Sequence, residues 1–250
     1  MNIHRNPWVT VTLFAIAMGL LEAIVVVYLR ELYYPEGFGF PLKAMKPGIA
    51  GIELLRELAT LVMLITVGVI TGKTATGRFA WFIYSFAIWD LFYYVFLKVL
   101  LGWPDSFFTW DILFLIPVTW VGPVLGPLIN SFTMIVLAVI LIRGNTNREL
   151  SLNSFEWILL VSGSLIIFLA YTKEYTSFML SKFTIDALLN PSNSKELLTF
   201  ATSFIPIRFD WVLFLAGVLL QWLAMCSAFL RTHSGFIEVR SKRSEIRGQK

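Results

Sequence analysis

Charged residues are scarce in this sequence of 250 residues. Lys, Arg, Asp and Glu together make up 14% of the chain, and 57% of its residues are hydrophobic, whereas about a quarter of the residues in a soluble domain are charged. A soluble protein of this length needs a polar shell around its core, and this composition does not supply one. The deficit excludes a soluble globular domain and predicts an integral membrane protein with the lipid bilayer as its partner.

Cysteine and histidine are almost absent as well. The single cysteine, Cys226, lies within an apolar run, so the chain has no internal disulfide and no thiolate metal cluster. His4 and His233 fall outside every apolar run, which excludes bis-histidine haem and histidine-rich di-iron sites within the membrane. Without an intramembrane histidine to activate a nucleophile, nucleophilic catalysis has no support. No metal site is predicted, and no cofactor is indicated.

Six apolar segments are long enough to cross a bilayer, for which about 20 residues are needed. They run approximately over residues 8–29, 51–71, 79–101, 112–142, 155–180 and 211–230. The first is too long for the core of a signal peptide, and we interpret it as an uncleaved span. The pattern predicts an all-α, polytopic membrane helical bundle. A single transmembrane domain would cover residues 1–230, followed by a basic cytoplasmic tail at residues 231–250.

The fourth segment is too long for one ordinary span, because a helix over residues 112–142 would extend about 46 Å, against a hydrocarbon core of about 30 Å. Pro117, Pro123 and Pro127 lie close together in it, and each removes a backbone donor and disfavours helix just before it. A break in the helix is therefore predicted. Irregular backbone at membrane depth is tolerated only beside protein or a watery cavity. Pro117 and Pro123 are therefore expected to line a chamber.

The distribution of Lys and Arg predicts the orientation of the chain. With the amino terminus in the cytoplasm, more than half of the 20 basic residues lie in short cytoplasmic loops and in the tail. Six spans then place both termini in the cytoplasm of a multi-pass cell-membrane protein. Because topology accounts for the net charge of +4, no nucleic acid partner is expected.

Charged side chains interrupt the apolar segments mainly in the half that is predicted to face outward. They are Glu22, Glu53, Arg56, Glu57, Asp90, Asp111, Lys173 and Glu174. Such residues are costly at membrane depth and usually face the bundle interior or a cavity. Apart from Glu156, the inner half has no acidic side chain. The asymmetry predicts that the eight residues form a site for protons, cations or a substrate.

Helical spacing brings several of these residues together. Glu53, Arg56 and Glu57 are three and four residues apart, so they project from one helical face. Tyrosines lie close to Asp90 and Lys173 along the chain and offer phenolic donors. They are Tyr93, Tyr94, Tyr171 and Tyr175. The spacing predicts one polar chamber lined by tyrosine.

Two interpretations of the cluster are open at this point. Acids and bases within a membrane can simply pair across helices, with Arg56 and Lys173 as the bases. However, five carboxylates within the spans face only these two bases, so some carboxylates must be protonated, hydrated or bound to a cation. The leading hypothesis is a transporter- or channel-like protein whose outward-facing acidic chamber handles protons, cations or a small solute.

Two alternatives come from other functional classes. The first is a membrane-embedded enzyme that acts on a lipid or isoprenoid at the outer leaflet, with carboxylates such as Asp90 and Asp111 as an acid-base dyad. The second is a non-catalytic subunit of a membrane complex, whose protein partners the sequence does not identify. Two packing features are also predicted: an interhelical hydrogen bond from Gln221, and a close helix contact at Gly68 and Gly72.

Overall fold

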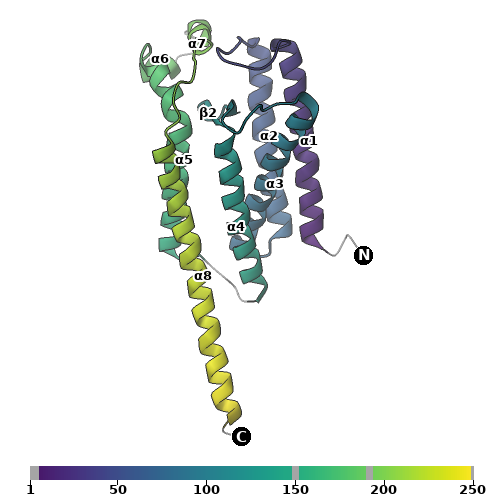
Figure 1. Cartoon of the computed structure of the whole chain (residues 1–250), viewed down its shortest axis with the longest axis vertical. Helices are drawn as coiled ribbons and strands as arrows, with labels where there is room; N and C mark the ends of the chain where they lie inside the picture. The colour runs from purple at the N-terminus through teal and green to yellow at the C-terminus, as the bar shows by residue number, and fades with distance from the viewer. Residues whose placement is uncertain (1–5, 148–151, 190–193, 249–250) are drawn as a thin grey trace.

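The computed structural model describes residues 6–147, 152–189 and 194–248. Six helices in these ranges are long and apolar enough to cross a membrane. They are α1 (Pro7–Tyr33), α2 (Pro47–Thr71), α3 (Ala75–Leu101), α4 (Leu125–Asn147), α5 (Ser154–Leu180) and α8 (Trp211–Gly248). They stand side by side with both chain ends toward the same end of the bundle (Figure 1). The predicted all-α, multi-pass bundle is confirmed.

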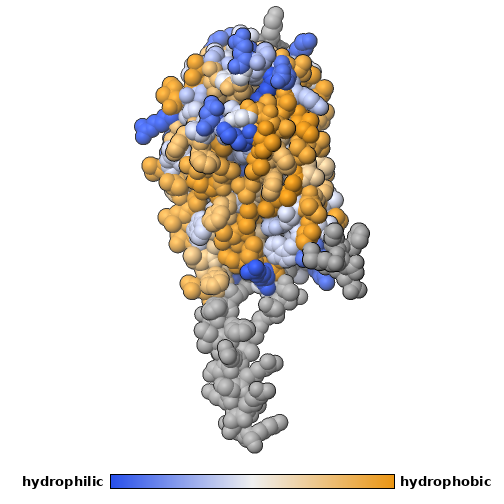
Figure 2. Space-filling view, turned by 45° about the vertical axis from the view of Figure 1, so that its right-hand side comes forward, coloured by the Kyte–Doolittle hydropathy of each residue, from blue (hydrophilic) through white to orange (hydrophobic). Residues whose placement is uncertain are grey.

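The outer surface of the bundle is apolar around its middle (Figure 2). Large aliphatic side chains on the spanning helices, such as Leu55, Ile70 and Leu165, are exposed. Exposure of this kind is expected where lipid covers the protein, and it would be a liability in water. Hydrophilic residues gather at the end of the bundle that lies opposite the chain termini, as Figure 2 also shows.

Local capping explains where several helices begin and end. The side chain of Thr74 accepts the N–H of Gly77 at 3.0 Å and begins α3, and Gly102 ends that helix in the left-handed conformation at φ +68°. At the start of α5, Asn153 and Glu156 exchange side-chain and backbone hydrogen bonds as a capping box. These contacts satisfy helix-end donors that would otherwise lack a partner.

Glu156 is the one acidic residue that the sequence places in the inner half, and its role there is structural. Its carboxylate is fully buried and forms an ion pair with Arg231 at 2.8 Å. It also accepts a hydrogen bond from Ser227 at 3.2 Å. Because both partners belong to α8, this acid ties the inner ends of α5 and α8 together.

The fourth apolar segment is broken at its prolines, as predicted, but the part before the break is not helical. It forms a hairpin of two antiparallel strands, β1 (Trp110–Phe114) and β2 (Trp120–Pro123), before α4 begins. Prolines in the turn and at the end of β2 remove helical donors, and the β-branched and aromatic residues between them favour strands. The Trp120 indole donates to the carbonyl of Ile116 at 3.0 Å and closes the turn.

The helices fall into two packed groups (Figure 1). In the first, α3 packs against α1, α2 and α4; in the second, α5 packs against α8. The second group meets the first mainly through α4 and β2. Buried apolar residues such as Tyr84, Leu137 and Met225 fill the inner half between the groups. At the opposite end, the loop before α8 carries the short helices α6 (Ile185–Leu189) and α7 (Ser194–Ala201).

Two pairs of glycines allow the closest helix approaches. A Cβ atom on Gly68 would lie 2.6 Å from the carbonyl oxygen of Arg78, so α2 and α3 touch there as the sequence predicted. A Cβ atom on Gly163 of α5 would lie 2.6 Å from the carbonyl oxygen of Gly217 of α8. One turn along, Gln221 donates to Ser164 at 3.0 Å, which confirms the predicted interhelical hydrogen bond.

Candidate chamber

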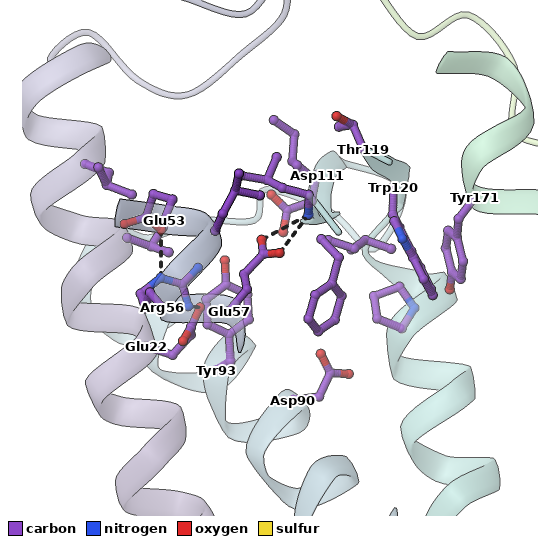
Figure 3. A pocket seen from close by; sticks show the side chains of 18 of the residues that line it. Glu22, Glu53, Arg56, Glu57, Asp90, Tyr93, Asp111, Thr119, Trp120 and Tyr171 are labelled. Atoms are coloured by element: carbon purple, nitrogen blue, oxygen red, sulfur yellow. Dashed lines mark hydrogen bonds and ion pairs between the residues drawn. The ribbon is translucent and has the colours of Figure 1, made fainter. Parts of the chain in front are cut away.

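A cavity of about 620 Å³ lies between the two helix groups, in the half of the bundle opposite the termini. Figure 3 shows that carboxylates enter it from α1, α2, α3 and the hairpin, and that aromatic rings close its other side. We refer to this cavity as the chamber. Most of the site residues proposed from the sequence line it. They are Glu22, Glu53, Arg56, Glu57, Asp90, Tyr93, Tyr94, Asp111, Tyr171 and Tyr175.

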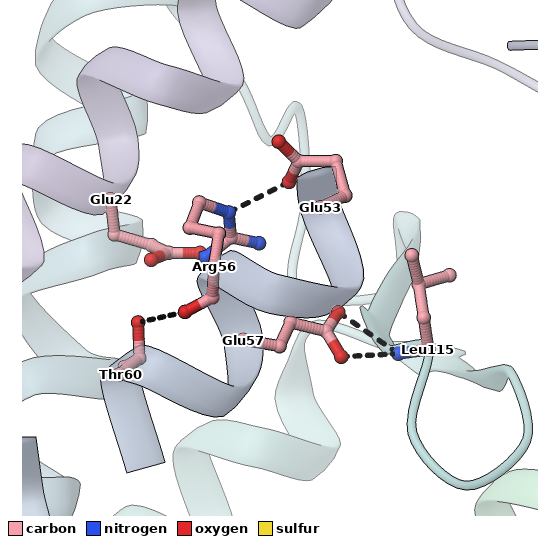
Figure 4. Close-up of polar contacts among 6 residues, drawn as sticks. All are labelled: Glu22, Glu53, Arg56, Glu57, Thr60 and Leu115. Atoms are coloured by element: carbon pink, nitrogen blue, oxygen red, sulfur yellow. Dashed lines mark hydrogen bonds and ion pairs between the residues drawn. The ribbon is translucent and has the colours of Figure 1, made fainter. Parts of the chain in front are cut away.

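Arg56 joins two carboxylates from two helices (Figure 4). Its Nε donates to Glu53, one turn earlier on α2, at 2.7 Å, and its guanidinium forms an ion pair with Glu22 of α1. The Arg56 carbonyl also accepts the hydroxyl of Thr60 at 3.0 Å. The side chains are largely shielded from solvent, so this group fixes α1 against α2 and uses two carboxylates in doing so.

Glu57 shares the helix with Arg56 but turns toward the hairpin. Both of its oxygens accept the backbone N–H of Leu115, each at 3.0 Å. Leu115 lies in the turn between β1 and β2, where its backbone N–H has no partner in the opposite strand. Glu57 supplies the acceptor for this N–H. The Glu57 side chain is 5% exposed and forms no ion pair with any residue that the structure describes.

Asp111, on the hairpin, has a cationic partner that the sequence reasoning did not include in the site. Arg30, near the end of α1, lies 3.7 Å from Asp111, and the Tyr94 hydroxyl donates to the same carboxylate at 3.1 Å. The guanidinium of Arg30 also lies 3.8 Å from the ring centre of Trp103 and 4.6 Å from that of Phe38. The sequence does contain a feature that could have placed Arg30 in the site. Arg30 follows Glu22 by about two helical turns, so the two side chains project from nearby faces of α1.

Asp90 enters the chamber from the middle of α3. Its carboxylate accepts the hydroxyl of Ser131, on α4, at 2.6 Å. Asp90 and Asp111 share no hydrogen bond, since each has partners of its own. Within the described ranges Asp90 has no ion pair, so it and Glu57 are the two chamber carboxylates without a cationic partner.

Four aromatic rings form one side of the chamber beside Asp90, and we refer to them as the aromatic wall. Phe86 stacks on Phe114 with centroids 6.2 Å apart, Phe114 lies 5.7 Å from Trp120, and Trp120 stacks on Tyr171 at 5.9 Å. Figure 3 shows Trp120 and Tyr171 at the right-hand side of the chamber, above the level of Asp90. The wall joins residues from α3, the hairpin and α5, and therefore from both helix groups.

Two polar atoms among the chamber residues are buried without a partner in the described part of the chain: the indole nitrogen of Trp89 and Oδ1 of Asn130. The Asn130 amide nitrogen donates to the Tyr171 hydroxyl at 3.1 Å, so the orientation of the side chain is set. Its carbonyl oxygen is thus an unused acceptor. Buried polar atoms nearly always have a partner, so each such atom needs an explanation.

Four of the proposed site residues do not line the chamber. Lys173 forms an exposed ion pair with Asp210 at 2.7 Å, and its hydrogen bond lowers the pKa of Asp210 below the ordinary value. Glu174 accepts the backbone N–H of Ile207 at 2.7 Å and holds the loop before α8. Both side chains therefore leave α5 on a side away from the chamber. Pro117 and Pro123 shape the hairpin, and the proline that does line the chamber is Pro127.

The structure also changes the count of charges. Five carboxylates line the chamber. Two buried or half-buried bases, Arg30 and Arg56, line it as well, and the exposed Lys43 lies at its rim. Acids thus remain in excess after Lys173 is removed from the cluster and Arg30 is added. No group of three or more His, Cys, Asp or Glu side chains in the described ranges is arranged to hold a metal ion.

Comparisons with models of protein families, with curated proteins and with solved structures found no match. The geometry of the chamber is therefore the basis for a functional argument.

Proposed function

We propose that this multi-pass membrane protein is transporter-like and that its chamber takes up a proton, a cation or a small cationic solute from the outer side. The observation that carries the proposal is the pair of carboxylates, Glu57 and Asp90, that face a cavity of about 620 Å³ with no ion pair among the described residues. An isolated charged carboxylate at membrane depth is costly. Binding of a proton or cation removes that cost and gives the site its selectivity.

The placement of the chamber supports movement of a solute past it. The chamber lies between the group formed by α1, α2, α3 and α4 and the pair formed by α5 and α8. The apolar core around Tyr84, Leu137 and Met225 closes the chamber toward the chain termini. Many carriers bind their solute near the midplane between two rigid groups and rock one group against the other. The contacts through α4 and β2 are where this movement would occur.

Outward opening of the chamber is part of the same proposal, because Lys and Arg are concentrated at the end that carries both termini. Glu36 and Lys73 are exposed at opposite ends of the bundle. In a Cys226→Ser background, we expect Glu36→Cys to react with a membrane-impermeant maleimide in intact cells. Lys73→Cys should react only after permeabilisation. The opposite pattern would mean that the chamber opens to the cytoplasm.

A flux measurement tests the proposed function. The protein is reconstituted in liposomes on a solid support, and charge movement is recorded after rapid addition of Na⁺, K⁺ or alkylammonium ions and after a pH step. We expect a transient for at least one of these, and we expect Asp90→Asn combined with Glu57→Gln to reduce it to background.

Glu196→Gln is the matched control, because it also removes one carboxylate, from an exposed ion pair with Lys182 outside the chamber. This variant should retain the full transient. A transient of native size in the Asp90 and Glu57 double variant would overturn the proposal.

A membrane-embedded enzyme acting on a lipid is the second candidate, and one observation favours it. The chamber reaches from the hydrophilic end of the bundle down to Ser164 of α5 and Gln221 of α8, and aliphatic side chains such as Val26, Leu54 and Ile167 are part of its lining. An acyl chain could lie along these side chains while its headgroup meets Asp90. Conversion of a purified outer-leaflet lipid that depends on Asp90, without any charge movement, would favour this candidate over a carrier.

A further inference from the structure

We infer that the chamber binds a protonated organic amine, with its ammonium group at Asp90 and its hydrocarbon part against the aromatic wall. The inference rests on the proposed function in that it names the class of solute that the same chamber accepts. Three features carry it: the unpaired carboxylate, an unused acceptor in the same cavity, and the ring surface beside them.

Asp90 and Asn130 offer acceptors that an N–H cation can use. Ser131 donates to only one oxygen of the Asp90 carboxylate, at 2.6 Å, which leaves the other oxygen for a ligand. Asn130 is adjacent to Ser131 on α4, and its Oδ1 is buried without a partner in the part of the chain that the structure describes. A primary ammonium group has three donors and no acceptor. It can therefore neutralise the Asp90 carboxylate through one N–H and still has donors left for a second acceptor of the chamber, such as Asn130 Oδ1.

The aromatic wall provides the surface for the rest of the ligand. Phe86 precedes Asp90 by one helical turn on α3, so the ring and the carboxylate project from the same face. Trp120 and Tyr171 line the same cavity and continue the row of rings away from Phe86 and Phe114 (Figure 3). Aromatic faces attract organic cations within about 6 Å and also pack against hydrocarbon.

The size and charge of the chamber favour an organic cation over the simpler ligands. A proton or a bare inorganic ion does not need a cavity of about 620 Å³, which is in the range of pockets that enclose small organic molecules. Arg56 pairs with Glu22 and Glu53, and Arg30 pairs with Asp111, but five carboxylates outnumber these two guanidinium groups. The excess negative charge includes Glu57 and Asp90, which have no ion pair among the described residues, so the chamber would repel an anionic solute.

The test is equilibrium binding to the full-length protein in nanodiscs made of phosphatidylglycerol. The probes are 4-phenylbutylammonium, its neutral counterpart 4-phenylbutanol, and the trimethylated ammonium, which has no N–H donors. We expect the primary ammonium to bind most tightly. Asp90→Asn should weaken binding of the primary ammonium by about 10- to 100-fold, as expected for loss of a charged hydrogen-bond partner. The affinity for the alcohol should stay nearly unchanged.

Two further variants keep the test decisive. Phe86→Leu removes one ring of the aromatic wall without changing the charge, and it should weaken binding of the primary ammonium by about threefold to tenfold. This variant keeps the test informative if Asp90→Asn does not fold. Glu196→Gln lies outside the chamber and should bind all probes as the native protein does. Equal binding of the ammonium and the alcohol to the native protein would overturn the inference, as would native affinity in both Asp90→Asn and Phe86→Leu.

The same assay identifies the source of the amine. Adding phosphatidylethanolamine, whose headgroup carries a primary ammonium, should displace the probe if the natural ligand is a lipid, and should leave it bound if the ligand is a free amine. Binding without charge movement in liposomes would overturn the transporter proposal and retain the amine site. Movement of protons or inorganic cations without amine binding would overturn the amine site and retain the transporter proposal.

Discussion

Replacing Arg56 by Met is expected to destabilise the protein by about 3–5 kcal/mol, the usual result when one partner of a buried ion pair is removed. The guanidinium lies between Glu22 and Glu53, from two different helices. Without it, two shielded carboxylates face each other, and at least one must take up a proton or draw water into the bundle. Thermal unfolding of the detergent-solubilised protein, together with chemical unfolding, measures the change.

A rescue experiment shows whether this loss comes from uncompensated charge. Glu22→Gln and Glu53→Gln combined with Arg56→Met remove all three charges, and we expect most of the lost stability to return. Lys182→Met breaks an exposed ion pair with Glu196 and should change stability by less than about 1 kcal/mol. If Arg56→Met alone were as stable as the native protein, the three side chains would not be held together as the structure shows.

Gly163→Leu is expected to separate α5 from α8 and to lower the free energy of unfolding by about 3 kcal/mol or more, at the upper end of the cost of overpacking. A Cβ atom at Gly163 would lie 2.6 Å from the Gly217 carbonyl oxygen, and one at Gly217 would lie 2.7 Å from the Gly163 carbonyl oxygen. Both obstacles are backbone atoms, so no rotamer change relieves the clash. Thermal unfolding and the yield of folded protein measure the effect.

Leu165→Phe is the matched control for this substitution. Leu165 lies two residues away on α5 and is 57% exposed on the lipid-facing surface, so a larger side chain there meets no helix. We expect its unfolding temperature to stay close to that of the native protein. A Gly163→Leu protein as stable as this control would contradict the close approach of α5 and α8.

The helix pairing affected by Gly163 also bears on the chamber. Tyr171 and Gln221, which line the chamber from the second helix group, belong to α5 and α8. Moving α8 away from α5 would therefore displace one side of the chamber without changing Asp90 or Glu57. The same variant should consequently weaken ligand binding in any fraction that remains folded, which separates the contribution of the chamber's shape from that of its charge.

The spans themselves could be predicted from the sequence because hydropathy is a local property. The first predicted segment, residues 8–29, corresponds to α1 at Pro7–Tyr33, and the fifth, residues 155–180, corresponds to α5 at Ser154–Leu180. The break at the prolines was predictable for the same reason, since a proline disrupts the helix within one turn of itself. The hairpin before α4 was not, because an apolar run reads equally well as a buried helix or a strand.

The sequence by itself determined that the chain is a multi-pass membrane protein, where five of its six candidate spans lie, and that acids outnumber bases in one half of the bundle. Only the tertiary structure decided which acids have a cationic partner and which have a neutral one. Asp111 meets Arg30 and Asp90 meets Ser131, whereas Lys173 pairs with Asp210 outside the chamber. These partners are far apart along the chain. Helical periodicity specifies which residues share a face of one helix, but it carries no information about which face of another helix lies opposite.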